Sequence, residues 1–164
     1  MFKNISLIIT LCASLLTAHA ATADYQVVPL PQEISMSKGK PFVLSASTPI
    51  VYTGSDAQMQ KNANFLSDYV EQLTKIRLNV SSQKVKKTTP IVLALNPKIA
   101  GNEAYVMTVT DKQLTIAGKT PAGVFYGIQT LRKSLPVLDA AENIELPAAV
   151  IKDAPKFAYR GFFE

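Results

Sequence analysis

The chain has 164 residues, with 17 lysines and arginines against 12 aspartates and glutamates, and a formal net charge of +5. It contains one cysteine, Cys12, one histidine, His19, and no tryptophan. Both single residues lie in a segment that we expect to be removed, which leaves no disulfide framework, thiolate nucleophile, histidine base or Cys/His zinc site. We therefore expect no cofactor and no metal, and the remaining length favours one compact domain.

The first 20 residues have the order that directs export across a membrane. Lys3 supplies a positive charge, an uncharged and mostly apolar run covers residues 5–16, and Ala18-His19-Ala20 follows. We expect a signal peptide over residues 1–20, cleaved after Ala20 or, as the second choice, after Ala23. A membrane anchor or a buried N-terminal helix is the alternative, but the run is shorter than the roughly 20 apolar residues that span a bilayer. The exported chain then has no membrane contact, and its lack of disulfides favours a periplasmic or extracellular location.

Short strands and a helix come first in the exported chain. Residues 25–31 are extended and broken by prolines, which suits an edge segment, and residues 42–44 and 50–52 are strand candidates. From Ala57 the apolar residues recur at helical spacing, with Ser55 or Asp56 available as the cap. The pattern predicts a surface helix whose buried side carries Met59, Ala63, Leu66, Val70 and Leu73.

The middle of the chain contains the densest basic stretch and three further strands. Lys84-Val85-Lys86-Lys87 lacks the charge and interleaved aromatics of a nucleic-acid site, so we expect a solvated loop and no nucleic-acid partner. Residues 91–95 are almost continuously apolar, which predicts a central strand covered on both faces. Residues 105–110 and 113–117 predict a hairpin, and its buried face carries Tyr105, Met107 and Val109.

A second helix is expected to open at Thr120-Pro121, with threonine as the N-cap and proline at the first helical position. Gly123 and Gly127 lie on the same side of it, and each costs about 1 kcal/mol relative to alanine in a helix interior. That cost is tolerable if the helix backbone lies close against another surface. A strand-like tail covers residues 144–151. The order of elements predicts a two-layer α+β domain over residues 24–152, with both helices on one face of a mostly antiparallel sheet.

Three stretches of the sequence carry a family resemblance. They are PLPQEI at residues 29–34, the run EAYVMTVTDKQLTIAGKTPAGVFYGIQTLRKSLP at residues 103–136, and IKDAPKFAYRGFFE at residues 151–164. Together they resemble the N-terminal part of the glycoside hydrolase family 20 β-N-acetylhexosaminidases. In that family a small α+β domain precedes a (β/α)8 catalytic barrel. The resemblance covers nearly all of the exported chain, and it implies that a barrel is expected to follow but is absent from these 164 residues.

The resemblance implies an exo-acting hydrolase that removes terminal N-acetylglucosamine or N-acetylgalactosamine from glycans with retention. The 2-acetamido oxygen attacks the anomeric carbon, an aspartate orients it, and an adjacent glutamate protonates the leaving oxygen. The exported chain contains no adjacent Asp-Glu pair, so we expect no catalytic residue in it and no activity of the chain alone. Arg160 matches the arginine of the family's first barrel strand, which binds hydroxyls of the terminal sugar. After it the sequence departs from the family, ending Phe162-Phe163-Glu164 where Leu-Asp is common.

These features lead to one main interpretation and one alternative. The chain is expected to be the N-terminal scaffold of an exported hexosaminidase, with residues 153–164 forming the linker and first strand of a truncated barrel. Its partners are then the barrel itself and, only with the barrel, a terminal N-acetylhexosamine glycan. The alternative is a stand-alone exported module that binds a glycan or a protein. We expect Tyr105 and Tyr126 to pack in the core with hydrogen-bonded hydroxyls rather than to contact sugar, and Glu71, Asp111 and Asp153 to be solvated carboxylates.

Overall fold

The computed structural model describes residues 20–83, 85 and 87–156. Residues 1–19 of the predicted signal peptide and the stretch that contains Arg160 lie outside the described residues, as do Lys84 and Lys86 of the basic stretch. Val85 and Lys87 of that stretch are exposed.

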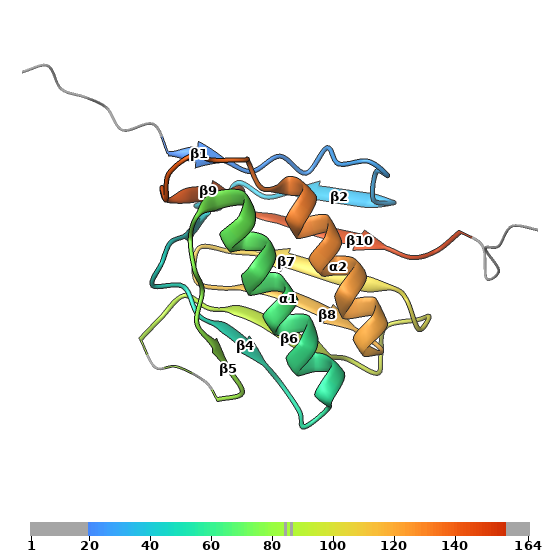
Figure 1. Cartoon of the computed structure of the whole chain (residues 1–164). Helices are drawn as coiled ribbons and strands as arrows, with labels where there is room; N and C mark the ends of the chain where they lie inside the picture. The colour runs from blue at the N-terminus through green and yellow to red at the C-terminus, as the bar shows by residue number, and fades with distance from the viewer. Residues whose placement is uncertain (1–19, 84, 86, 157–164) are drawn as a thin grey trace, which may run out of the picture.

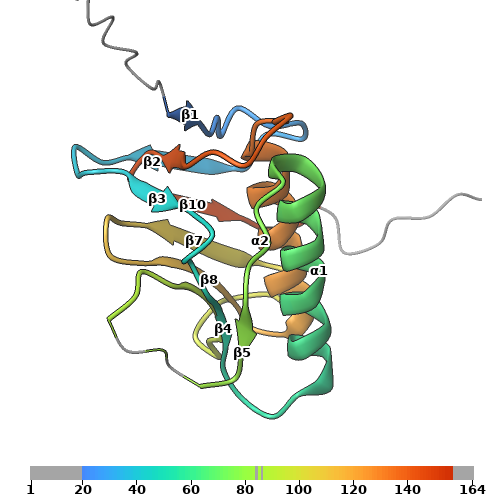
Figure 2. The same ribbon diagram turned by 60° about the vertical axis from the view of Figure 1, so that its left-hand side comes forward.

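A mixed sheet with two helices on one face forms the body of the domain, and a small second sheet lies beside it (Figure 1). Turning the molecule by 60° shows both helices on the same side of the sheet (Figure 2). The predicted α+β, two-layer arrangement is therefore confirmed. The large sheet has the strand order β2-β10-β7-β8-β6-β4-β5, formed by β2 (Glu33–Met36), β4 (Ile50–Tyr52), β5 (Val80–Ser81), β6 (Ile91–Leu95), β7 (Tyr105–Val109), β8 (Leu114–Gly118) and β10 (Ala149–Asp153). The small sheet has the order β1-β9-β3, formed by β1 (Ala21–Thr22), β3 (Phe42–Leu44) and β9 (Ile144–Leu146).

The large sheet has an antiparallel half and a parallel half. The neighbours β2, β10, β7 and β8 pair antiparallel, as expected for a hairpin and the strands around it. The neighbours β8, β6, β4 and β5 pair parallel. A parallel pair needs a crossover between its strands, and the first helix provides one between β4 and β6. The sheet is therefore mixed, with three antiparallel and three parallel neighbour pairs, and not mostly antiparallel as expected. Its antiparallel pairs lie on the side from which the chain leaves the domain.

Strand β6 lies between β8 and β4, as predicted, but it is covered on one face only. Ile91 and Leu93 are buried, whereas Val92 and Ala94 are half-buried. The expectation of cover on both faces was wrong because both helices lie on the same side of the sheet. The continuous apolar run reflects small side chains on the uncovered face rather than a second layer.

Both helices begin where the sequence predicts. Helix α1 (Ala57–Thr74) is capped by Asp56, whose carboxylate accepts a hydrogen bond from the Gln58 backbone N–H at 2.7 Å. Helix α2 (Pro121–Ser134) follows Thr120, whose hydroxyl donates to the Asn102 carbonyl instead of capping the helix. The predicted apolar stripe of α1 is buried at its first four positions, and Leu73 is partly buried. Asn62 joins the helices, because its buried amide donates to the Pro121 carbonyl at 2.8 Å.

Helix α2 packs against β7 and β8 through its two glycines. A Cβ atom added to Gly123 would overlap the carbonyl oxygen of Ala104, and one added to Gly127 would overlap the side chain of Ile116. The Cβ on Gly127 would also lie 3.1 Å from the ring of Tyr105. The predicted close approach of the helix backbone is confirmed at both positions.

We predict that Gly123→Ala destabilises the domain by about 2 kcal/mol although alanine is the better helix former, because the overlap is with a backbone atom that cannot move aside. Gly127→Ala should cost less, since the Ile116 side chain can shift. Thermal unfolding followed by circular dichroism measures both, with Gln60→Ala on the exposed side of α1 as the control. An increase in Tm for Gly123→Ala would contradict the packing described here.

Candidate functional site

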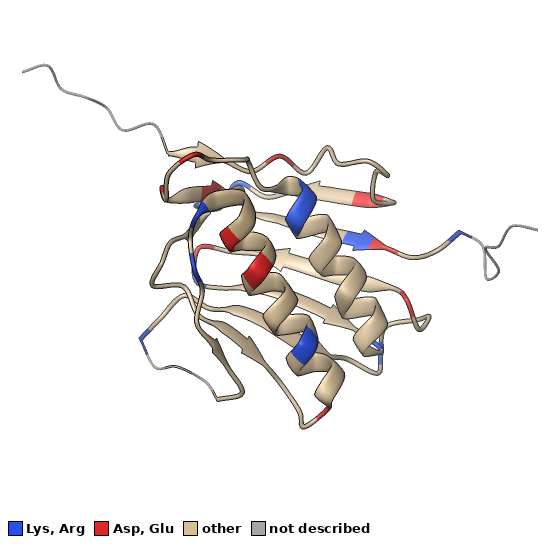
Figure 3. Ribbon diagram, in the orientation of Figure 1, with Lys and Arg blue, Asp and Glu red and all other residues tan. Residues whose placement is uncertain are grey.

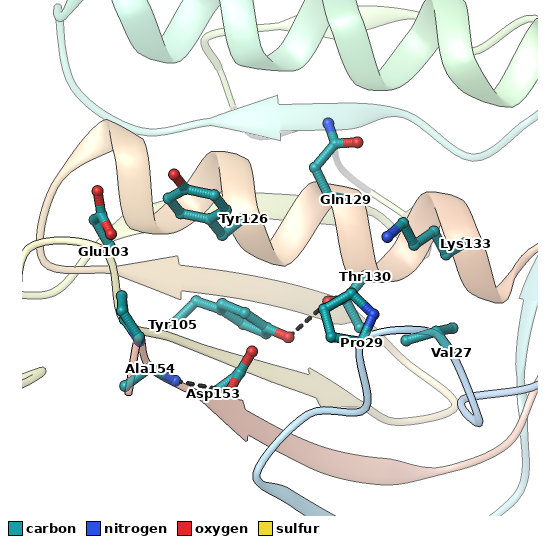
Figure 4. A pocket seen from close by; sticks show the side chains of 11 residues that line it. Val27, Pro29, Glu103, Tyr105, Tyr126, Gln129, Thr130, Lys133, Asp153 and Ala154 are labelled. Carbon is teal, nitrogen blue, oxygen red and sulfur yellow. Dashed lines mark hydrogen bonds between the residues drawn. The ribbon is translucent and has the colours of Figure 1, made fainter. Parts of the chain in front are cut away.

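A cleft of about 290 Å³ lies between α2 and the end of β10, where the described chain leaves the domain (Figure 4). Helix α2 contributes Tyr126, Gln129 and Lys133 to its wall, and the start of β7 contributes Tyr105. The exit segment, residues 153–155, forms the opposite side. The cleft therefore joins parts of the chain that are far apart in sequence at the point from which any following segment begins.

Tyr105 crosses the base of the cleft, and its hydroxyl is hydrogen-bonded to Thr130 Oγ1 at 2.6 Å (Figure 4). Only 2% of the residue is exposed. Burial raises the pKa of Tyr105 to about 12, and the charge of Asp153 acts in the same direction. The expected core packing of Tyr105 with a bonded hydroxyl is confirmed.

Asp153 is half-buried and holds backbone groups in place. Its Oδ1 atom accepts hydrogen bonds from the Ala154 N–H at 2.9 Å and from the Gln32 N–H at 3.3 Å. The expectation of a simply solvated carboxylate was wrong for Asp153, because the end of β10 lies between two neighbouring segments. Asp111 is exposed as expected, and Glu71 forms a surface ion pair with Arg77 at 3.6 Å.

Two polar side chains of α2, Lys133 and Gln129, line the cleft. Lys133 Nζ donates to the Val28 carbonyl at 2.6 Å and so holds the segment of residues 27–29 at the rim of the cleft. Gln129 Nε2 is buried and has no acceptor among the described residues, whereas its Oε1 atom accepts from Arg132 at 3.4 Å. A buried amide donor needs an acceptor. The Gln129 amide nitrogen is therefore an enclosed donor whose hydrogen-bonding capacity the described residues do not satisfy.

Tyr126 lies at the surface, with 38% of it exposed, so the expectation that it packs in the core was wrong. It lies two positions from Val124 and from Ile128, which are buried on the side of α2 that faces the sheet, so its own side chain points outward. It continues an aromatic cluster across the outer faces of both helices, in which each contacting pair of rings has a centroid separation of 6.3 Å; the cluster consists of Phe65, Tyr69, Phe125 and Tyr126. The charges of α2 are confined to its C-terminal end (Figure 3), where the Arg132 guanidinium lies 4.7 Å from the Tyr69 ring centroid.

The cleft is lined by polar, charged and aromatic side chains. Within residues 20–83, 85 and 87–156, no three His, Cys, Asp or Glu side chains come together as a metal site. In the part of the chain that the structure describes, no helix is long and apolar enough to cross a membrane.

Gln32 and Gln129 were not predicted from the sequence as functional candidates. Both lie inside stretches that carry the family resemblance, and this position could have indicated them as candidates.

We predict that Tyr105→Phe lowers the free energy of unfolding by about 1–2 kcal/mol, because Thr130 loses its buried partner. The raised pKa favours the neutral phenol in the folded state, so its contribution is present below pH 10 and is lost as pH rises through about 12. Tyr105→Phe should therefore show a weaker alkaline loss of stability than the unmodified chain, measured by urea unfolding between pH 8 and pH 11. An identical pH dependence in the two proteins would contradict the burial of this hydroxyl.

Comparison with known proteins places this architecture in one family. The family model described as glycosyl hydrolase family 20, domain 2, matches residues 24–154. A β-N-acetylhexosaminidase of Cellulomonas fimi is 27% identical over 139 residues, which cover 84% of this chain and 28% of that protein. A β-hexosaminidase of Porphyromonas gingivalis is 28% identical over 142 residues, which cover 83% and 18% respectively.

The solved structure of a GH20 β-N-acetylhexosaminidase from Streptomyces coelicolor A3(2) superimposes with a TM-score of 0.74 at 28% identity. The match covers 87% of this chain and 29% of that one. The chain thus spans less than a third of the length of these relatives. Since the family model matches residues 24–154, which is most of the chain, the chain belongs to glycosyl hydrolase family 20, of which it contains domain 2.

Proposed function

We propose that this chain is the N-terminal scaffold of an exported exo-β-N-acetylhexosaminidase, which removes terminal N-acetylglucosamine or N-acetylgalactosamine from glycans. The match of residues 24–154 to domain 2 of the family carries the proposal. The names of the relatives from Cellulomonas fimi and Porphyromonas gingivalis support it. In this proposal the hydrolysis itself takes place in a following barrel, by attack of the substrate's own acetamido oxygen.

Arg160 is proposed to bind the terminal sugar as part of the first barrel strand. It lies five residues after Pro155, a stretch that spans at most about 18 Å when extended. A guanidinium offers five N–H donors in a planar fork, which suits neighbouring sugar hydroxyls. The scaffold therefore ends close to the substrate-binding part of the proposed enzyme.

The cleft and the aromatic cluster are proposed to pack against the barrel. The exposed ring of Tyr126 belongs to both, and the chain leaves the domain beside them. A covering domain would remove the exposed aromatic surface of Phe65 and Tyr126 from water. These features favour the helix layer over the open sheet face as the surface of contact.

Export is proposed to remove residues 1–20. Cleavage after Ala20 leaves β1 intact, in which Ala21 pairs with Ile144 and Thr22 with Glu145. Cleavage after Ala23 would delete that strand and the buried Ala23. The pairing of β1 thus supports the first of the two cleavage sites.

We predict that the exported chain alone releases no chromophore from a chromogenic N-acetyl-β-glucosaminide. A chimera in which residues 24–161 replace the corresponding N-terminal region of the Cellulomonas fimi enzyme should hydrolyse it. In the chimera, Arg160→Ala should raise KM at least about tenfold, since sugar hydroxyls lose charged donors.

The matched control for this experiment is the Cellulomonas fimi enzyme without that N-terminal region, which we expect to be inactive or insoluble. Turnover that copurifies with the isolated chain would overturn the scaffold role. Saturable binding of an N-acetylglucosamine oligomer to the isolated chain, without hydrolysis, would instead favour a stand-alone binding module.

We predict that the chain secreted by a bacterial host begins at Ala21, as read by intact mass spectrometry. Leu11→Arg should abolish export, because a charge interrupts the apolar run that the export machinery recognises. Lys40→Arg serves as a control outside the segment. A secreted product that still begins at Met1 would contradict the proposed signal peptide.

A further inference from the structure

Two of the stretches that carry the family resemblance meet at the point where the chain leaves the domain. Gln32, in PLPQEI, donates from its backbone N–H to Asp153 Oδ1 at 3.3 Å and from its side-chain Nε2 to the Ala154 carbonyl at 2.5 Å. Asp153 Oδ1 also accepts from the Ala154 N–H at 2.9 Å. We call Gln32, Asp153 and Ala154 the exit clamp.

The register of the sheet explains why a side chain is needed there. Strands β2 and β10 pair antiparallel with Glu33 opposite Lys152, and an ion pair of 3.1 Å joins these two side chains. Continuing the register places Gln32 opposite Asp153 and Pro31 opposite Ala154. Proline has no N–H, so the backbone ladder cannot continue at that position. The side-chain amide of Gln32 supplies a donor to Ala154 where Pro31 has none.

The exit segment is also restrained from its other side and by its own sequence. Asp153 pairs with Tyr105 of β7, the last pair of that ladder. Pro155 fixes its own φ and keeps the preceding Ala154 extended. The chain therefore leaves the domain along a direction defined by β7, by the exit clamp and by a proline.

We propose that Gln32 and Asp153 are positioning residues, which fix the direction in which the chain enters the segment that contains Arg160. The clamp sets how this domain is joined to the next part of the protein. The identity of that next part as a sugar-binding barrel strand rests on the proposed function, whereas the contacts of the clamp do not. Because Gln32 is exposed and Asp153 is half-buried, the clamp can be removed without disturbing the core.

The first experiment measures backbone order at the exit in the isotope-labelled exported chain. ¹⁵N relaxation should give amide order parameters of about 0.8 at Ala154 and Lys156, falling below about 0.6 in Gln32→Ala and Asp153→Ala. Asp153→Asn should keep the native values, because its amide oxygen still accepts from both backbone N–H groups. Gln60→Ala, far from the exit, is the control, and Tm reports that each variant is folded.

The second experiment uses the chimera with the Cellulomonas fimi enzyme. Trypsin should cut after Lys156 about tenfold faster in Gln32→Ala and Asp153→Ala than in the parent and in Asp153→Asn. Unchanged order parameters at Lys156 together with unchanged cleavage would overturn the inference. If the chimera is inactive while the exported chain loses order at the exit in both alanine variants, the proposed function is refuted and the clamp is upheld.

Discussion

Helix α2 lies so close to β7 and β8 that glycine is required at two of its contact positions, and the site depends on this approach. Gly123 lies against the Ala104 carbonyl, and Gly127 lies against Ile116 and Tyr105. These contacts fix the position of the helix on the sheet. This position brings Thr130 within hydrogen-bond distance of the Tyr105 hydroxyl. It also fixes the side chains that α2 presents to the cleft. The two glycines therefore weaken the helix locally while defining its position.

The antiparallel half of the sheet determines where the cleft can form. Strand β10 lies between β2 and β7, so the chain ends its last strand with neighbours on both sides. The two ladders end one residue apart on β10, with Glu33 opposite Lys152 and Tyr105 opposite Asp153. Polar groups released by the end of two ladders need partners. Gln32 and the Asp153 carboxylate provide them, which accounts for polar residues at the place where the chain leaves the sheet.

Periodicity and local chemistry predicted the elements that form their own pattern. The stripe of α1 and the hairpin follow from the spacing of apolar residues. The cap of α1, the start of α2 and its close approach to the sheet follow from the chemistry of Asp56, Pro121 and the two glycines. Strand β2 was missed because its residues are mostly exposed and do not alternate, so only pairing with β10 makes it a strand. The exposure of Tyr126 could have been predicted from its position in the helical repeat of α2. The contacts of Gln32, in contrast, depend on how β2 pairs with β10, which neither segment shows by itself.

Stability and direction come from different parts of this domain. The buried side chains of the helices and sheet hold the fold together, whereas hydrogen bonds near the surface each contribute only about 0.5–1.5 kcal/mol net. The same hydrogen bonds also restrain the backbone direction at Ala154. In any extended chain, a rotation of about 10° displaces a point about 17 Å further along by about 3 Å. Residues that add little to the unfolding free energy can therefore set the direction in which the chain leaves the domain at Ala154.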